Sequence, residues 1–218
     1  GKKVCTMTVI IDYGCGNLLS LKRALDEFKF KSEVSKDKSK ILNADLLILP
    51  GVGAFENAIK LLKKNDLIDT IVNFTIKKNK PLIGICLGMQ ILFTKSFEMG
   101  EHNGLNLIEG DVDRINKNTK NRQLKVPHIS WNEIFFKKKA SFNKDSTSSL
   151  NEKSFYFVHS YMATPSNEEN LIANCKYFDV EVPAIVKKGK IVGFQFHPEK
   201  SGKNGLKLLK QTINDLLK

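Results

Sequence analysis

Residues 81–90 read Pro-Leu-Ile-Gly-Ile-Cys-Leu-Gly-Met-Gln. A buried strand enters a Gly-x-Cys-x-Gly turn and leaves as a helix, which is the nucleophile-elbow pattern with cysteine in place of serine. The tight turn strains its central residue and needs small neighbours, and Gly84 and Gly88 meet that need. The start of the helix favours a thiolate on Cys86, and the amide of Leu87 can donate to an oxyanion. A structural cysteine buried at a turn is the alternative that this stretch alone leaves open.

Short apolar runs alternate with helical patterns around this elbow, and the alternation predicts a parallel sheet covered by helices. Apolar residues at helical spacing follow Asn17, and the breaker Pro50-Gly51 ends the second strand. The expected strands are Thr8–Asp12, Leu46–Leu49 and Pro81–Ile85, and the expected helices begin at Asn17, run from the second strand to about Lys78, and cover Gly88–Phe93.

Beyond Leu105 the pattern changes to strands separated by polar turns, which indicates an added antiparallel region. The run Lys137–Lys153 is rich in Lys, Ser and Asn and predicts a loop. The expected strands here are 105–115, 126–136, 155–161, 171–177, 183–187 and 191–196, and a last helix follows Ser201 as N-cap with Leu206, Leu209, Ile213 and Leu216 on one side. No repeat or linker divides the chain, so residues 1–218 are expected to form a single α/β domain with a doubly wound, mostly parallel sheet.

The chain of 218 residues carries a formal net charge of +12, but nearly all of its basic residues are lysines. Arginine, the residue suited to bidentate recognition of bases and phosphates, occurs only at Arg23, Arg114 and Arg122. The lysines are scattered or clustered in polar loops without interleaved aromatic residues. A solvated surface, part of which faces an acidic partner, is therefore favoured over nucleic-acid binding.

Four cysteines, Cys5, Cys15, Cys86 and Cys175, are widely spaced and form no CxxC pair. Neither a disulfide framework nor a zinc site is indicated. The first apolar stretch is too short for a secretory signal, and glycines and Gln90 interrupt the apolar run at 82–93. We therefore expect a cytoplasmic protein that needs no metal, no cofactor and no membrane.

A thiolate nucleophile needs a base, and the base needs a third group to orient it. His197 lies in Phe-His-Pro-Glu-Lys-Ser, residues 196–201, directly after an expected strand. Pro198 stiffens the turn, and Glu199 is close enough to hold one ring nitrogen. His159 ends another strand and either lines the site or is a structural histidine; the remaining two histidines lack an acidic neighbour of this kind. A cysteine elbow and a separate strand-end His-x-Glu together predict a Cys-His-Glu site.

Leu49-Pro-Gly-Val-Gly53 also follows a buried strand, where the strand ends of a doubly wound sheet converge on a ligand crevice. Glycines there permit peptide flips and let amide groups point into the crevice. Alone, the motif is often only a turn, but beside the elbow it is a candidate second oxyanion donor. Residues 13–17, Tyr-Gly-Cys-Gly-Asn, have the same two interpretations and are too short for a dinucleotide fingerprint.

Together these motifs resemble those of class I glutamine amidotransferases, over essentially the whole chain. Within that family the chain is similar to the glutaminase subunits of imidazole glycerol phosphate synthases, which serve histidine biosynthesis. The supporting motifs are Asp-Tyr-Gly-Cys-Gly-Asn at 12–17, Pro-Gly-Val-Gly at 50–53, Gly-Ile-Cys-Leu-Gly-Met-Gln at 84–90, Pro-His-Ile-Ser-Trp-Asn at 127–132, Phe-Val-His-Ser-Tyr at 157–161 and Phe-His-Pro-Glu-Lys-Ser at 196–201. One departure is Ser130, which stands where these subunits usually carry glycine.

The resemblance implies a flavodoxin-like fold and a role for each matching residue. Cys86 would be the nucleophile, His197 the general base and then acid, and Glu199 its orienter, with the backbone amides of Val52 and Leu87 as the oxyanion hole. The implied glutamine-binding residues are Gly53, Gln90, Glu98, Ser160 and Tyr161, and those facing a (β/α)8-barrel cyclase partner are Asn17, Trp131, Tyr156 and Lys200. In such a heterodimer ammonia from L-glutamine passes along a dry route to the cyclase, and Lys200 pairs with an acidic partner residue.

Three alternatives remain open from the sequence. A paralogous subunit could supply ammonia for amidination in surface-sugar synthesis, for which Ser130 leaves room. A cysteine hydrolase of the protease or chaperone type usually takes its base from beside the nucleophile, where this chain has Leu87. A flavodoxin-like binding module would carry an inert cysteine.

The glycines at 50–53 also predict regulation. We expect the free subunit to be nearly inactive, with the Gly51–Val52 peptide pointing its carbonyl rather than its amide into the oxyanion site. One oxyanion donor is worth roughly 10²–10³ in rate. Docking of the partner would then restore activity through contacts that differ between the two states.

Overall fold

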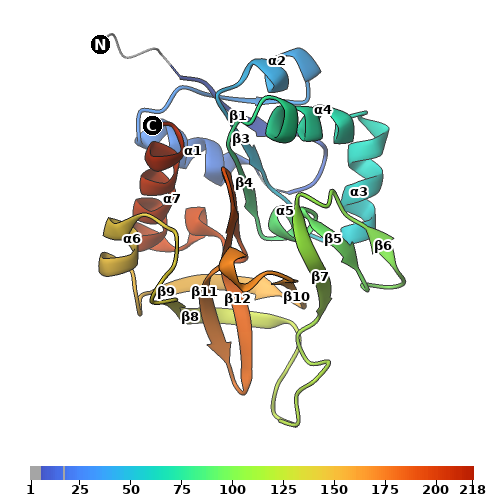
Figure 1. Cartoon of the computed structure of the whole chain (residues 1–218), viewed down its shortest axis with the longest axis vertical. Helices are drawn as coiled ribbons and strands as arrows, with labels where there is room; N and C mark the ends of the chain where they lie inside the picture. The colour runs from blue at the N-terminus through green and yellow to red at the C-terminus, as the bar shows by residue number, and fades with distance from the viewer. Residues whose placement is uncertain (1–5, 17) are drawn as a thin grey trace.

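A computed structural model describes residues 6–16 and 18–218 (Figure 1), so Cys5 and the interface prediction for Asn17 lie outside the described residues. The described residues form a nine-stranded sheet and a four-stranded sheet. In spatial order the larger sheet contains β2 (Ser32–Ser35), β1 (Thr8–Ile11), β3 (Leu46–Leu49), β4 (Leu82–Ile85), β13 (Ile191–Phe194), β12 (Val180–Lys188), β11 (Leu171–Tyr177), β8 (His128–Phe136) and β9 (Ser154–His159).

The larger sheet is parallel from β2 to β13 and antiparallel from β13 to β9. Its parallel part contains the three strands expected in the first half of the chain, two of them shortened by one residue at one end. The antiparallel part is built from second-half segments. The predicted α/β class, with an added antiparallel region, is confirmed.

Helices cover both faces of the parallel strands, as Figure 1 shows. They are α1 (Leu19–Glu27), α2 (Lys38–Asn43), α3 (Phe55–Lys64), α4 (Ile68–Val72) and α7 (Gly202–Leu216). Successive strand residues point to opposite faces. Ile10 of β1 therefore packs in a core cluster with α1 and α7, whereas Val9 packs in the cluster that contains α3 and α4.

The helix expected over Gly88–Phe93 is wrong in its second half. Helix α5 is a single turn, Leu87–Gln90, and strand β5 (Phe93–Ser96) begins three residues later. The helix stops because the carbonyls of Ile91 and Leu92 accept the amides of Leu105 and Leu107, each at 2.8 Å. Strand β5 joins the smaller sheet, whose order is β10 (Tyr161–Pro165), β7 (Ile108–Arg114), β5 and β6 (His102–Asn103).

The loop expected over Lys137–Lys153 contains a helix, α6 (Lys144–Ser149). Asn143 caps it by accepting the Ser146 amide at 3.0 Å, and Leu150 anchors it in the core. The composition of this segment did not predict the helix, because the helix is stabilised by only one capping residue and one apolar residue.

Ser201 does precede α7, but its hydroxyl does not cap the helix. It donates to the His197 carbonyl at 2.6 Å and accepts the Tyr156 amide at 2.9 Å. The buried face of α7 includes Leu208, Leu209 and Ile213, with Leu206 and Leu216 only partly buried. The remaining helical turns are η1 (Asn73–Lys77), a π-helical continuation of α4, and the 3₁₀ turns η2 (Glu168–Asn170) and η3 (Pro198–Lys200).

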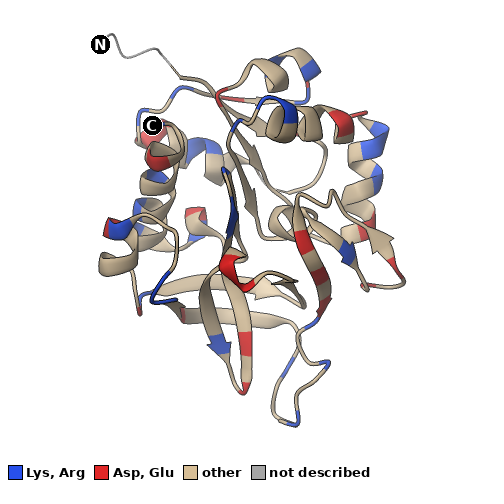
Figure 2. Cartoon of the chain, in the orientation of Figure 1, with Lys and Arg blue, Asp and Glu red and all other residues tan. Residues whose placement is uncertain are grey.

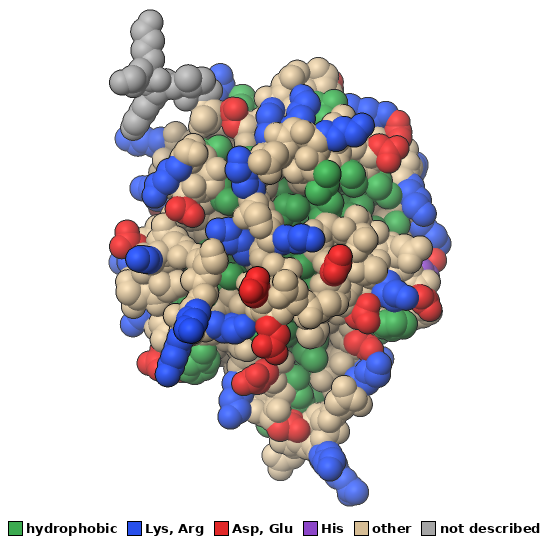
Figure 3. Space-filling model, in the orientation of Figure 1, with side chains coloured by type: hydrophobic (Ala, Val, Ile, Leu, Met, Phe, Trp, Pro, Cys, Tyr) green, Lys and Arg blue, Asp and Glu red, His purple; other side chains and the backbone are tan. Residues whose placement is uncertain are grey.

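The basic residues are dispersed over helices, loops and strand ends (Figure 2). On the face shown in Figure 3, lysine and arginine side chains are interspersed with acidic and neutral ones. This arrangement is typical of a solvated lysine-rich surface. Within the described residues, no helix combines the length and the apolar character needed to cross a membrane.

Candidate active site

Three sequence motifs meet because the strands that precede them are neighbours. Strand β4, which leads into Cys86, lies between β3 and β13, with Leu49 opposite Gly84 and Phe194 opposite Ile85. The 50–53 loop follows β3, and His197 follows β13. The carboxyl ends of parallel strands lie at one edge of a sheet, so the elbow, the glycine loop and the His-Pro-Glu turn converge there.

Cys86 occupies the strained position of the elbow. Its φ is 56° and its ψ is −115°, a conformation that residues other than glycine rarely adopt. Its amide donates to the Phe194 carbonyl at 2.7 Å, which fixes the turn against β13. A Cβ on Gly88 would overlap the Leu49 carbonyl oxygen, so only glycine permits this close approach of α5 to β3. The predicted tight strand-to-helix turn is present.

His197 and Glu199 form a buried pair. Nδ1 of His197 lies 2.7 Å from Oε1 of Glu199, and the two side chains are 5% and 4% exposed. Nε2 of His197 has no hydrogen-bond partner within the described residues and is free to serve the sulfur or a substrate. Burial opposes a charge on the ring, but Cys86 and Glu199 outweigh it and raise the pKa of His197 to about 10.

Three consecutive carbonyls of the glycine loop are each held by a different donor. The Tyr13 hydroxyl donates to Pro50 O at 2.6 Å, the Leu87 amide to Gly51 O at 3.3 Å, and the Cys15 thiol to Val52 O at 2.9 Å. Burial, helped by Cys15, raises the pKa of Tyr13, so its phenol keeps the proton that it donates.

The Gly51–Val52 peptide is therefore oriented with its carbonyl toward the elbow. Because a trans peptide is planar, the Val52 amide points away from the amide of Leu87. Neither amide that the sequence proposes for the oxyanion hole is free to act there: one is turned away, and the other is bonded to Gly51.

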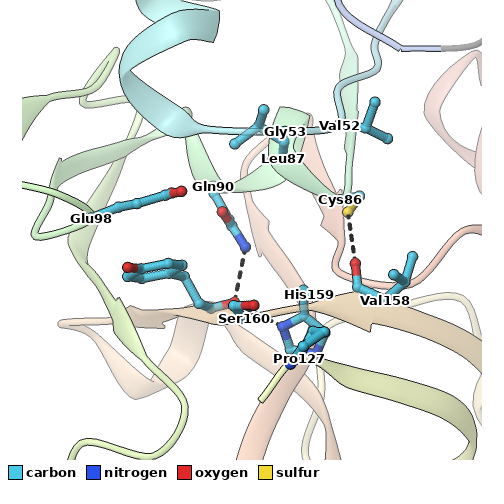
Figure 4. A pocket seen from close by; sticks show the side chains of 11 residues that line it. Val52, Gly53, Cys86, Leu87, Gln90, Glu98, Pro127, Val158, His159 and Ser160 are labelled. Atoms are coloured by element: carbon cyan, nitrogen blue, oxygen red, sulfur yellow. Dashed lines mark hydrogen bonds between the residues drawn. The ribbon is translucent and has the colours of Figure 1, made fainter.

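A cavity of about 300 Å³ opens beside Cys86 (Figure 4). The predicted glutamine-binding residues Gly53, Gln90, Glu98, Ser160 and Tyr161 all line it, together with Val52, Leu87 and His159. His159 therefore lines the site, which is one of its two expected roles.

Two acceptors face this cavity. Nε2 of Gln90 donates to Tyr161 O at 2.9 Å and to Gln195 Oε1 at 3.0 Å, which leaves Gln90 Oε1 for a ligand. Oε2 of Glu98 accepts the Phe55 amide at 3.3 Å, and burial raises the pKa of this half-buried carboxyl. Figure 4 shows the side chains of Gln90 and Glu98 to the left of Cys86. An amide oxygen and a carboxylate suit an ammonium or amide group of a small ligand.

The structure also adds site residues that the sequence analysis missed. Gln195 is fully buried, holds Gln90, and points its Nε2 toward the Cys86 sulfur at 3.8 Å. As a lone polar residue within the apolar run Ile191–Phe196, it could have been found. Tyr13 and Cys15 lie in the 13–17 motif that the sequence singles out, but their side-chain hydrogen bonds to the 50–53 loop could not be predicted, because they depend on the pairing of β1 with β3.

The predicted partner-facing residues that the structure describes gather around one strand pair. Trp131 lies opposite Tyr156 across β8 and β9, with ring centroids 6.0 Å apart, and Trp131 is 54% exposed. Lys200 is exposed and adjoins Ser201, which binds the Tyr156 amide. These side chains form an aromatic and basic surface beside the His197 turn.

Comparison with known proteins gives consistent results. A family model described as glutamine amidotransferase class-I matches residues 9–216. The protein named imidazole glycerol phosphate synthase subunit HisH from Carboxydothermus hydrogenoformans is 44% identical over 204 residues, 94% of this chain and 97% of its own length. Proteins of the same name from Oceanobacillus iheyensis and Aquifex aeolicus are 42% identical (94% of this chain, 97% of their own length) and 44% identical (93% of each).

Solved structures share the fold at low sequence identity. One described as a glutamine amidotransferase has a TM-score of 0.68 at 21% identity and covers 96% of this chain and 98% of its own. The structure of PurLQS from Thermotoga maritima has a TM-score of 0.70 at 18% identity, with 98% and 100% covered.

Proposed function

This chain belongs to the class-I glutamine amidotransferases, and from that premise we propose that it is the glutaminase subunit of an imidazole glycerol phosphate synthase, with Cys86, His197 and Glu199 as its catalytic residues. The observation that carries the proposal is the buried His197–Glu199 pair beside a strained cysteine that lines a cavity. Relatives named for that synthase, identical at more than 40% over nearly the full chain, support its assignment.

The proposed reaction begins with the thiolate of Cys86 attacking the carboxamide carbon of glutamine. The C=O electrons move onto oxygen, and collapse of the tetrahedral intermediate expels ammonia, which takes a proton from the His197 imidazolium. The raised pKa of His197 keeps that proton available at neutral pH. Neutral His197 then activates water, which hydrolyses the thioester to glutamate and restores the thiolate. Glu199 holds the ring through Nδ1 in both steps.

The substrate assignment follows from the cavity. We propose that Gln90 Oε1 and the Glu98 carboxylate hold the α-ammonium end of glutamine, with Gly53 and the Ser160–Tyr161 edge along its length. The scissile amide then lies at Cys86, between the 50–53 loop and α5. The cavity of about 300 Å³ suits one amino acid.

The oxyanion hole is proposed to form only on activation. A tetrahedral oxyanion needs the amides of both Val52 and Leu87, and rotation of the Gly51–Val52 peptide would supply the first and release the second at once. The side-chain bonds to Pro50 O and Val52 O lie on either side of that peptide, so they favour a rotation confined to it. Free ammonia is largely protonated near pH 7, which makes a dry route to the acceptor necessary.

The proposed partner is a (β/α)8-barrel cyclase that docks on the Trp131, Tyr156 and Lys200 surface, with Asn17 also assigned to that interface. The 218 residues would act as one amidotransferase domain, without metal or cofactor, in the reducing cytoplasm, where the thiolate stays available. Ser130 adjoins Trp131 in β8 but lies on the opposite face of the strand.

A reconstitution experiment tests the proposal. The chain is mixed with a barrel cyclase subunit and its nucleotide substrate, and imidazole glycerol phosphate is measured with glutamine or with ammonium salts as nitrogen source. We expect glutamine to support the reaction only when the chain is present, and a diazo-ketone analogue of glutamine to label Cys86. Labelling without product would retain the amidotransferase and reject the cyclase as partner, whereas absence of labelling would reject the mechanism.

A further inference from the structure

Two buried histidines lie outside the Cys86–His197 pair. His128 is fully buried and His159 is 7% exposed, and they are cross-strand partners in β8 and β9. Nδ1 of His128 lies 2.9 Å from Nε2 of His159, and Nδ1 of His159 lies 2.7 Å from the Tyr161 carbonyl. On the other side, Nε2 of His128 lies 2.9 Å from the side chain of Asn132, which lies on the same face of β8 as His128 and on the opposite face from Trp131. A continuous hydrogen-bonded chain thus runs from Asn132 to the glutamine cavity.

The groups at its ends determine which ring nitrogens in this hydrogen-bonded chain donate and which accept. A carbonyl only accepts, so His159 must carry its proton on Nδ1. Burial lowers the pKa of His159 to about 3, so the ring is neutral and its Nε2 is an acceptor. His128 must then donate from Nδ1. Burial also lowers the pKa of His128, so its Nε2 is an acceptor as well.

In a neutral His128, Nε2 therefore needs a hydrogen bond donated by Asn132. The Asn132 amide stands with Oδ1 toward both His128 Nε2 and the Ser130 hydroxyl. A half-turn of that amide places Nδ2 there, able to donate to His128 and to Ser130; it replaces the 3.4 Å hydrogen bond from Nδ2 to the Lys176 carbonyl with Oδ1, an acceptor facing that carbonyl. Ser130, at a position where these subunits usually carry glycine, thereby provides an additional hydrogen-bond acceptor for Asn132 at the outer end of the chain.

At the inner end, the Tyr161 carbonyl accepts from both His159 and Gln90, which uses both of its lone pairs. The second hydrogen of Gln90 Nε2 goes to Gln195. The rotation of the Gln90 amide, and with it the place of the free Oε1, is thus set by fixed partners rather than by the ligand.

We propose that His128 and His159 are positioning residues, which act as a neutral relay from Asn132 to hold Tyr161 and Gln90 in place for the head group of glutamine. This inference rests on the proposed glutaminase function. The relay does not touch the reacting atoms, so it acts on glutamine binding more than on the chemical step.

The stacking around His128 offers matched variants. Its ring lies between Phe157 and Tyr177, with centroids 5.0 and 4.0 Å away and interplanar angles of 17° and 21°. His128→Phe retains an aromatic ring there but removes the donor to His159. His128→Asn shortens the side chain but keeps an N–H near the place of Nδ1.

In the complex with the cyclase, we expect His128→Phe to raise the glutamine KM about ten-fold with kcat within about three-fold, because a ground-state contact is lost. We expect His128→Asn to restore most of the KM despite its poorer packing. Unchanged KM in His128→Phe, or equal damage in both variants, would overturn the relay. Absence of glutaminase activity in the unaltered complex would instead count against the proposed function.

A second measurement needs neither activity nor a partner. Nitrogen-15 NMR of the histidine-labelled chain reports which ring nitrogens carry protons. We expect both His128 and His159 as neutral Nδ1–H tautomers, with the Nδ1–H signal of His159 preserved in His128→Phe. An Nε2–H tautomer at either ring, or an imidazolium at His128 near neutral pH, would refute the assignment.

Discussion

The turns that end β3 and β4 are neighbours built from similar residues, yet they differ in how firmly they are held. After β4, the Cys86 amide is bonded to Phe194 at 2.7 Å, and Gly88 leaves no space for any other residue. After β3, the Gly51 carbonyl is held by one longer bond of 3.3 Å, and Val52 is 43% exposed. We therefore propose that Cys86 and His197 are positioned in advance, whereas the oxyanion donors depend on rotation of the Gly51–Val52 peptide.

This difference separates two requirements of catalysis. The strain at Cys86 is supported by packing from β3 and β13 and does not depend on any ligand. We propose that the two states of the Gly51–Val52 peptide differ little enough in free energy for a docked partner to reverse the balance between them. Substitution of Cys86 should therefore abolish glutamine hydrolysis, whereas substitution of Gly51 or Gly53 should change how the partner regulates it.

The largest effect is expected from Cys86→Ala. We expect glutamine hydrolysis to fall by about 10⁴-fold or more, because no other nucleophile is available. The side chain loses a single sulfur atom, so the melting temperature and the affinity for the cyclase should stay near those of the parent. Hydrolysis is followed by glutamate release in the complex, with calorimetry as the control for folding. Substantial remaining hydrolysis would show that the elbow is not the reactive part.

A smaller effect is expected from Gly51→Ala. A Cβ at this position would lie 2.7 Å from the Tyr13 hydroxyl and 3.1 Å from the Gly88 amide nitrogen, so it hinders rotation of the peptide. We expect the partner-stimulated kcat to fall by roughly 10²–10³, the worth of one oxyanion donor. The glutamine KM should change only a few-fold, because Gln90 and Glu98 are untouched. Equal losses in kcat and in binding would contradict a role confined to the oxyanion.

The smallest effect is expected from Gly53→Ala, for which the chain offers a control. Gly53 (φ +101°) and Gly189 (φ +59°) both have positive φ and no atom within 4 Å of an added Cβ. An alanine should cost each position about 1 kcal/mol of stability. Only Gly53→Ala should also change the stimulated glutaminase rate, by about five-fold, through the balance between the loop states. A similar rate change in Gly189→Ala would assign the effect to general destabilisation.

The sequence predicted β1, β3 and β4 of the parallel half because each is a short run of fully buried, largely apolar residues, but it did not predict β2, a half-buried strand of mixed sequence at the edge of the sheet. Leu46–Leu49 matches its strand, and the elbow at Cys86 follows from local turn chemistry alone. The pairing of β11, β12, β8 and β9 could not be derived, since it depends on long-range contacts that alternation of residues does not specify. The end of the one-turn helix α5 could not be predicted for the same reason, because it is set by long-range hydrogen bonds to residues 105 and 107.

The candidate site divides in the same way. Cys86, His197 and Glu199 could be named because each stands in a short motif with its own chemical reason. The hydrogen bonds from Tyr13 and Cys15 to the 50–53 loop depend on which strands lie side by side, and so does the pairing of His128 with His159. His128 was set aside for want of an acidic neighbour, and its partner proved to be a histidine across the sheet.

The most direct test of a preformed nucleophile with an unformed oxyanion hole is the glutaminase kcat of the unaltered chain, measured alone and then with the cyclase and its nucleotide ligand. We expect stimulation of at least roughly 10²–10³-fold, the worth of one oxyanion donor, with little change in the glutamine KM. An isolated chain that already hydrolyses glutamine at the stimulated rate would contradict the account.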